Sequence, residues 1–396
     1  MESSSAQKPP LTRQYAALLL LRVGGGTSGL VASYALVSHA GRSWGSSETI
    51  GIMSAASNGS EMVAAVLTSC FVSMYSRRST LLIAAICGLL AVLAGMIPGI
   101  ELIWATRILD GFIAGVATTS LLSSVLREGS QNVRKRGRLV SSFEGVLIVG
   151  VAFGAILAAV LWPKVGLSTY IAVGLLYFAS GALLASTSRT KTISLARVRL
   201  GRPHIVMGAL VAMAISASMW LSQVGFLFTG PRRFGQWIPG SLTQSQVPIV
   251  LIGYLVIASI GLGIWAQVLR KWTTSRGVKI AVSGAVLAPL ILLGANVAAP
   301  SPMRWILLLI YVACVLIQVG LVPCILAALS SKGSDGDAAD PSGWYVAATA
   351  SGNIVGPLMG GVLAARWGAS GLCLGSFTCA VVAAALIFTW TGIKEK

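Results

Sequence analysis

Acidic residues are scarce in this chain. Among 396 residues only 11 are Asp or Glu, and the four charged residue types together make up 10%. No Asp or Glu occurs between Glu144 and Asp335. Soluble globular proteins carry about 25% charged residues, so the composition excludes a soluble domain. With 55% hydrophobic residues and a mean hydropathy of +0.83, the chain is predicted to be an integral membrane protein.

Residues typical of metal, nucleotide and catalytic sites are also few. The two histidines, His39 and His204, lie at the ends of predicted spans, and they supply neither a metal cluster nor a Ser-His-Asp arrangement. The six cysteines show no CxxC spacing and are interpreted as packing residues. No GxxxxGK[ST] motif is present, which argues against ATP as an energy source. The sequence therefore predicts no enzyme, no cofactor and no metal.

Apolar stretches recur along the whole chain at the length of about 20 residues that an α-helix needs to cross a bilayer. The strands of a membrane barrel would instead alternate with a period of two. The predicted spans are residues 14–38, 49–74, 80–99, 102–126, 139–162, 166–188, 204–229, 245–269, 280–299, 303–329, 342–365 and 368–391. The expected fold is an all-α membrane protein with twelve transmembrane helices.

The positions of the basic residues indicate how these spans are oriented across the membrane. Lys and Arg number 29 and give a net charge of +18, but they cluster in short loops, which indicates topology and not nucleic-acid binding. The two tails and the even-numbered loops hold 21 of them, whereas the odd-numbered loops hold 6. Both termini are therefore predicted to be cytoplasmic. The longest basic segment, Ser188–Pro203, divides the spans six and six, which suggests helical units at 1–188 and 204–396 joined by a cytoplasmic linker at 189–203.

The two halves of the chain echo each other, because small residues recur at matching places in spans five and eleven. They are Gly150 and Gly154 in the first half, and Gly352, Gly356, Pro357, Gly360 and Gly361 in the second. The two sets lie about half the chain apart, which indicates a repeated six-helix unit whose small residues pack helices closely.

At these residues the chain resembles the major facilitator superfamily. The stretch Gly352–Gly361 matches the family pattern gxxxGPxxGG, and Arg107–Gly115 is similar to its fourth-helix RxxxG element. Arg77 and Arg78 stand where the family carries arginines between its second and third helices. The resemblance, which extends to bacterial drug and metabolite exporters of the twelve-helix type, implies two pseudo-symmetric six-helix bundles. It also implies alternating access to a site near the midplane and a gating role for the two arginines.

Glu61 lies near the middle of the predicted span 49–74. An ionised carboxylate at that depth costs at least ~2.5–3.5 kcal/mol. One interpretation is a carboxyl that binds and releases a proton as the cavity changes access. The other is a protonated Glu that is hydrogen-bonded within the bundle. Asn58, three residues earlier, shares its helix face, and it is the expected polar neighbour and a candidate substrate contact.

Four further charged residues are candidates in the first half. Arg107 and Asp110 share a face of span four. Either they neutralise each other, or Arg107 faces the cavity and pairs with Glu61 or an anionic substrate, with Asp110 as a second proton-coupling residue. Arg22 in span one either extends to the surface or contributes to the substrate site. Glu144, about five residues into span five, is expected to make a gating contact with loop arginines.

The second half offers no ionisable residue deep in its spans. Its candidate substrate contacts are the polar and aromatic residues Trp220, Gln223, Tyr254, Gln318 and Asn353. An apolar, aromatic second half suits the body of an organic molecule, whereas the first half must carry any proton.

The resemblance to the major facilitator superfamily, taken with these residues, implies a secondary transporter that couples the proton gradient to efflux of a small amphipathic organic compound or metabolite. One alternative is an importer or facilitator of an anionic solute that uses Arg22 and Arg107. Another is a non-transporting receptor or scaffold. The expected partners are a small-molecule substrate and the lipid bilayer, with no nucleic acid, and the protein is expected to act as a monomer in a bacterial inner membrane.

Overall fold

The computed structural model describes residues 11–39, 47–70, 77–131, 133–187, 203–223, 247–298, 302–331 and 342–390. These residues form helices and no strands, as the sequence predicts. Helices suit long apolar segments because they satisfy every backbone polar group internally, which the bilayer core demands. Within the described ranges, eight segments are long and apolar enough to cross a membrane. The expected linker lies outside the described residues, apart from Pro203.

The elements follow the predicted spans along the chain. In the first half they are α1 (Leu11–His39), α3 (Ser47–Cys70), α4 (Arg77–Met96), α5 (Ile100–Gln131), α6 (Val133–Val165), the 3-10 turn η2 (Gly166–Ser168) and α7 (Thr169–Thr187). In the second half they are α8 (Pro203–Gln223), α9 (Val247–Lys271), α10 (Thr274–Val297), α11 (Met303–Gln318), α12 (Leu321–Ser331) and α13 (Ser342–Thr389).

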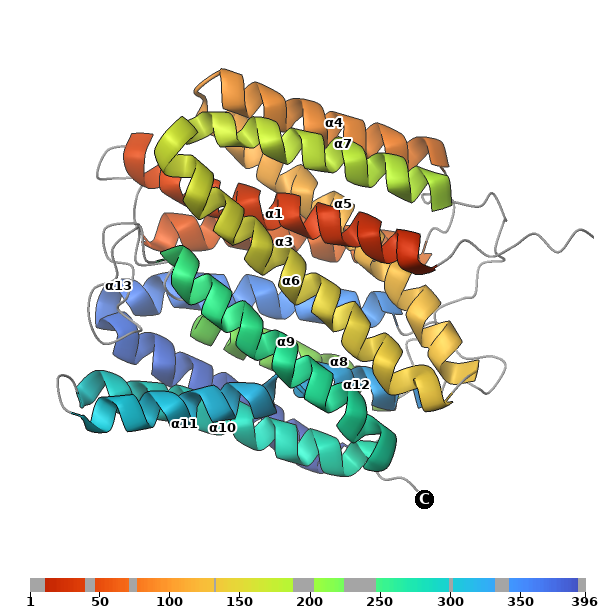
Figure 1. Ribbon diagram of the computed structural model, residues 1–396, viewed down its shortest axis with the longest axis vertical. Helices are drawn as coiled ribbons and strands as arrows, with labels where there is room; N and C mark the ends of the chain where they lie inside the picture. Colours follow the sequence, from red (N-terminus) through yellow and green to blue (C-terminus); the bar gives the residue numbers. More distant parts are fainter. Residues whose placement is uncertain are drawn as a thin grey trace, which may run out of the picture.

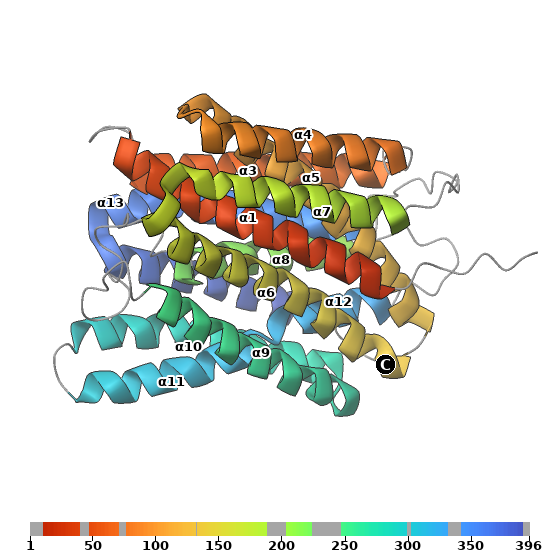
Figure 2. The same cartoon turned by 45° about the horizontal axis from the view of Figure 1, so that its top comes forward.

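The helices run side by side, with α4 and α7 at one edge of the molecule and α10 and α11 at the opposite edge (Figures 1 and 2). Helix α1 packs along α6 and α7, and α3 packs along α5. The most extensive contacts between the halves of the chain are α3 with α13 and α6 with α9, and α5 and α6 also meet α12 or α13. Helices α3, α5 and α6, which carry the buried charged residues Glu61, Arg107, Asp110 and Glu144, thus take part in contacts between the halves.

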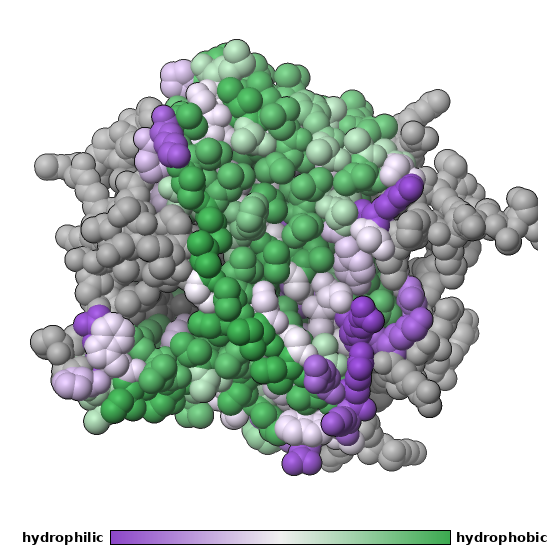
Figure 3. Space-filling view, in the orientation of Figure 1, coloured by the Kyte–Doolittle hydropathy of each residue, from purple (hydrophilic) through white to green (hydrophobic). Residues whose placement is uncertain are grey.

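The outer surface has the character expected of a protein in a bilayer. Figure 3 shows hydrophobic residues across the middle of one face, with hydrophilic residues gathered towards its two ends. Large apolar side chains such as Leu82, Leu175, Ile260 and Leu309 are more than half exposed. Contact of these side chains with lipid tails costs no free energy, whereas their contact with water is unfavourable.

The loop expected between spans four and five is mostly helical. Helix α5 continues to Gln131 and α6 starts at Val133, whereas the hydropathy pattern places the boundaries at 126 and 139. The extra turns carry Lys135 and Arg138, both exposed. Hydropathy marks only the apolar part of a helix, so polar turns that continue beyond the bilayer escape it.

The span expected at 303–329 is broken between α11 and α12. In an unbroken helix the Gly320 N–H would donate to the Leu316 carbonyl. Instead it donates to Ile317 O at 3.3 Å, and Leu316 O accepts from the Trp265 indole at 3.0 Å. A Cβ on Gly320 would overlap the Trp265 ring, so glycine is required for this close approach. Pro323 contributes as well, because it has no N–H to donate to Val319 O.

Helix α13 contains the two spans expected at 342–365 and 368–391. Gly368 interrupts it with a φ of 57° and a ψ of −140°. Positive φ values favour glycine because it lacks a Cβ. The chain folds back there, and the position of a Cβ on Gly371 would lie 2.8 Å from Leu363 O of the first arm.

Candidate functional site: a buried charge cluster on four helices

The charged residues of the first half come together in the interior. Arg22 lies on α1, Glu61 on α3, Arg107 and Asp110 on α5, and Glu144 on α6. Glu61, Arg107, Asp110 and Glu144 are each no more than 8% exposed. Buried charges are tolerated only when they are paired or hydrogen-bonded, so their partners decide what the cluster can do.

Glu61 is paired with Arg22. The Arg22 Nη2 lies 2.5 Å from Glu61 Oε1, and Nη1 lies 3.5 Å from Oε2. Nη2 also donates to Thr118 Oγ1 of α5 at 2.7 Å. One guanidinium therefore links α1, α3 and α5. Arg22 does not extend to the surface, since its side chain is only 17% exposed.

Arg107 is paired with Asp110 on its own helix, and not with Glu61. Its Nη1 also donates to Gly25 O of α1 at 3.2 Å. The glycines of α1 make room for this pair, because a Cβ on Gly25 would lie 2.9 Å from Asp110 Oδ1. The pair therefore fixes α5 against α1. Of the two acids considered as partners of Arg107, Asp110 and Glu61, the structure pairs it with Asp110.

Asn58 does not bind Glu61. Its Nδ2 donates to Ser54 O at 2.7 Å, four residues earlier on α3, so its amide is used within its own helix. The polar neighbour that sequence reasoning missed is Thr118. It lies eleven residues after Arg107, which is about three turns along one face of α5, and this spacing is the signal that could have identified it.

Glu144 is the acid of this cluster for which the described residues supply no ion pair. It is buried, and the charge of Arg22 acts on it as well as on Glu61. It is also within electrostatic range of Tyr345 of α13, in the other half of the chain. The expected contact with loop arginines is not seen in the part of the chain that the structure describes. The cluster thus contains two arginines and three acids, and Glu144 is the acid that has no arginine of its own.

Glycines bring α1 against α6 beside this cluster. A Cβ on Gly150 would lie 2.5 Å from Arg22 Cβ, and one on Gly154 would lie 2.7 Å from the Thr27 nitrogen. Thr27 Oγ1 donates to Gly154 O at 3.0 Å across this contact. The close approach of α1 and α6 therefore falls at Arg22 itself.

The matching glycines of the second half pack α13 between two helices. A Cβ on Gly352 would lie 2.7 Å from Ser216 Cβ of α8. On the other side, a Cβ on Gly51 of α3 would lie 2.6 Å from Pro357 O. Gly356, Gly360 and Gly361 are buried along the same helix. This stretch therefore forms close contacts both within the second half and with the first.

The other candidates of the second half are dispersed. Gln318 is buried at the end of α11, beside the helix break. Tyr254 is half-buried on α9 and packs against the same small apolar cluster as Ile148 of α6, and Asn353 is half-buried on α13. Trp220 and Gln223 fall in the last turn of α8, and their side chains lie outside the described residues, as do those of Arg77 and Arg78. Within the described ranges, no group of three or more His, Cys, Asp or Glu residues could hold a metal ion.

Comparisons with known proteins agree with this architecture. A family model described as Major Facilitator Superfamily matches residues 18–357. The human organic anion transporter MFSD10 (TETRAN) has a similar structure, with a TM-score of 0.71 and 16% identity over 96% of this chain and 100% of that one. A bacterial homologue of the iron transporter ferroportin in an outward-facing state is also similar, with a TM-score of 0.68 and 14% identity over 96% of this chain and 99% of that one.

A structure of a bacterial ferroportin homologue with soaked iron gives a TM-score of 0.67 and 14% identity, over 97% of this chain and 99% of that one. At these identities the likeness concerns the fold alone. No curated protein matches the chain in sequence.

Proposed function

The chain belongs to the major facilitator superfamily of transporters, and we propose that it is a proton-coupled secondary transporter that exports a small amphipathic organic compound. The observation that carries the proposal is the buried cluster of two arginines and three acids in which Glu144 has no ion pair. Intramembrane acids are costly and mark ion pathways in transporters. A surplus acid in such a cluster provides a place for one proton.

The proposed architecture has twelve spans in two six-helix bundles with both termini in the cytoplasm. Helices α1 to α7 make up the first bundle. In the second, α11 and α12 count as one broken span and α13 as two. Extensive contacts within each half support this division, such as α1 with α6 and α4 with α7 in the first half and α8 with α13 and α10 with α11 in the second. Alternating access would then be a rocking of one bundle against the other.

Glu144 is the proposed proton-binding residue, in place of Glu61 and Asp110. Glu61 and Asp110 each have an arginine partner, and a carboxylate must release its arginine before it can take up a proton. Glu144 has no such partner to release. The charge of Arg22 acts on both Glu61 and Glu144. When Glu144 loses its proton, Arg22 is attracted to two carboxylates instead of one. The added attraction favours a position of α1 closer to α6.

The proposed substrate lies between the charge cluster and the apolar second half, where Tyr254, Gln318 and Asn353 are the candidate contacts. The alternative of an anionic solute held by Arg22 and Arg107 is less well supported, because both guanidinium groups already bind carboxylates of the chain. The two neighbours named as organic anion and iron transporters are similar in fold alone.

Replacement of Glu144 by Gln tests the proposal. We expect transport driven by a pH gradient to fall to the rate measured without a gradient, since the amide cannot exchange a proton. Substrate exchange across the membrane without a gradient should continue. The measurement uses purified protein in proteoliposomes and the first compound that raises its melting temperature in a screen of drugs and metabolites at two pH values.

Glu48→Gln is the matched control, because Glu48 is exposed at the start of α3 and its loss should leave gradient-driven transport unchanged. The assignment to Glu144 is wrong if E144Q keeps gradient-driven transport while Glu61→Gln abolishes it. The broader proposal of proton coupling is wrong if no acid-to-amide variant in the cluster changes the response to pH.

A further inference from the structure

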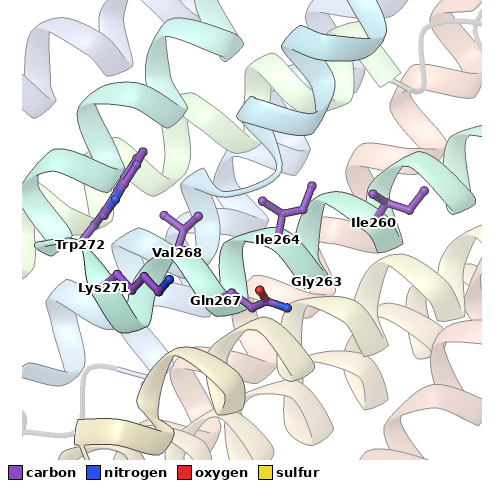
Figure 4. Close-up of a pocket in the computed structure, with 7 residues that line it drawn as sticks. All are labelled: Ile260, Gly263, Ile264, Gln267, Val268, Lys271 and Trp272. Carbon is purple, nitrogen blue, oxygen red and sulfur yellow. The ribbon is translucent and has the colours of Figure 1, made fainter.

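A groove lies on the exposed side of α9, away from the buried charge cluster. Its volume is about 390 Å³. The residues that line it are Ile260, Gly263, Ile264, Gln267, Val268, Lys271 and Trp272 (Figure 4). Gly263 opens its centre, because a Cβ there would meet no atom within 4 Å. The groove therefore has space for a ligand beside the helix, on a surface that the bilayer contacts.

The groove changes character along the helix. Exposed Ile252, Val256, Ile260 and Ile264 follow one another at intervals of four residues, so they form one apolar stripe. Gln267 and Lys271, also exposed, continue the same face to the end of α9. In Figure 4 the Lys271 side chain runs back along the helix towards Gln267. A ligand for this face needs an apolar chain at one end and a polar, anionic group at the other.

The polar end of the groove lies in a strongly basic region. Arg270 and Lys271 end α9, and Arg276 of α10 stacks over Trp272 with its Cζ 4.9 Å from the ring centroid. The start of α6 lies alongside, because a Cβ on Gly137 would be 3.0 Å from Leu269 Cβ. The next residue, Arg138, is exposed.

Figure 3 shows hydrophilic residues gathered towards this end of the molecule. No Asp or Glu occurs between residues 145 and 334, so no carboxylate of α9 or α10 offsets the charge. The distribution of Lys and Arg along the chain assigns these helix ends to the cytoplasmic side, where the leaflet carries anionic lipids.

We propose that this groove binds an anionic phospholipid of the cytoplasmic leaflet. The phosphate meets Lys271 and Gln267 at the end of α9, and one acyl chain lies along Ile264, Ile260 and Val256. Phosphate and chain together match the order of polar and apolar residues along the helix, which neither a free phosphate nor an uncharged lipid does. Because α9 packs on α6, the bound lipid lies beside a contact between the two halves of the chain.

The test compares lipid binding by the full-length protein in detergent. Phosphatidylglycerol is added in steps, and the bound lipid is counted by mass spectrometry of the intact protein. We expect saturable binding of one phosphatidylglycerol. We expect Lys271→Gln to weaken it by roughly fivefold, the contribution of one basic residue near an anionic membrane. Gly263→Leu should also weaken binding, because its side chain fills the groove without meeting the fold.

Lys164→Gln is the control, since Lys164 is exposed near the other end of α6 and its loss should leave binding unchanged. Inorganic phosphate should not raise the melting temperature of the protein, and phosphatidylcholine should bind more weakly than phosphatidylglycerol. The proposal is overturned if K271Q and G263L bind as the unchanged protein does. It is equally overturned if phosphatidylcholine binds as tightly, or if inorganic phosphate alone reproduces the stabilisation.

Discussion

Arg22→Met is expected to destabilise the protein by about 3–5 kcal/mol, because it leaves the Glu61 carboxylate buried without a partner. The two side chains are 17% and 9% exposed, so water compensates little of the lost interaction. Arg22 also donates to Thr118 at 2.7 Å, and that hydrogen bond disappears too. The measurement is the melting temperature and the free energy of unfolding in detergent, compared with the unchanged protein.

The double variant Arg22→Met/Glu61→Gln supplies the control, because it removes both charges. Replacing a buried pair by neutral groups of similar size is often nearly neutral, so the double variant should be more stable than Arg22→Met alone. If the two are equally destabilised, the Arg22–Glu61 contact is not the source of the effect. Thr118→Val separates the smaller contribution of the hydroxyl, which we expect to be about 0.5–1.5 kcal/mol.

Gly154→Ala is expected to destabilise the protein by about 1–3 kcal/mol, because the added methyl group overpacks a helix contact. Its Cβ would lie 2.7 Å from the Thr27 nitrogen and 3.0 Å from Gly26 Cα, and both are backbone atoms of α1. A flexible side chain could move aside, but here the whole helix must shift. The shift would also weaken the hydrogen bond from Thr27 to Gly154 O. The measurement is again the melting temperature in detergent.

Gly253→Ala on α9 is the matched control, since a Cβ there would meet nothing within 4 Å. Alanine favours a helix over glycine by up to ~1 kcal/mol, so this variant should be neutral or slightly stabilised. Equal effects at the two positions would contradict the steric explanation and would point to helix propensity instead.

The sequence predicted where the helices of this protein lie better than it predicted where they begin, end or are interrupted. Hydropathy located the helices because each must present about 20 apolar residues to lipid. It placed the start of α6 six residues too late, because polar turns outside the bilayer carry no hydropathy signal. It also missed the break after Gln318, which depends on the indole of Trp265 from another helix. The sequence predicted that one span ends at residue 365 and the next begins at residue 368, and α13 is interrupted at Gly368.

The sequence likewise predicted some features of the candidate site and missed others. That every acid within a predicted span lies in the first half follows from the sequence alone, because it requires only counting residues along apolar segments. The sequence also predicts that Arg107 and Asp110 share a helix face, since a spacing of three fixes that geometry. That Glu61 contacts Arg22 and that Glu144 has no ion pair is known only from the packing of the helices. Those outcomes depend on how the helices are rotated and how closely the glycines of α1 let them approach, and residue spacing within one helix carries no information on either.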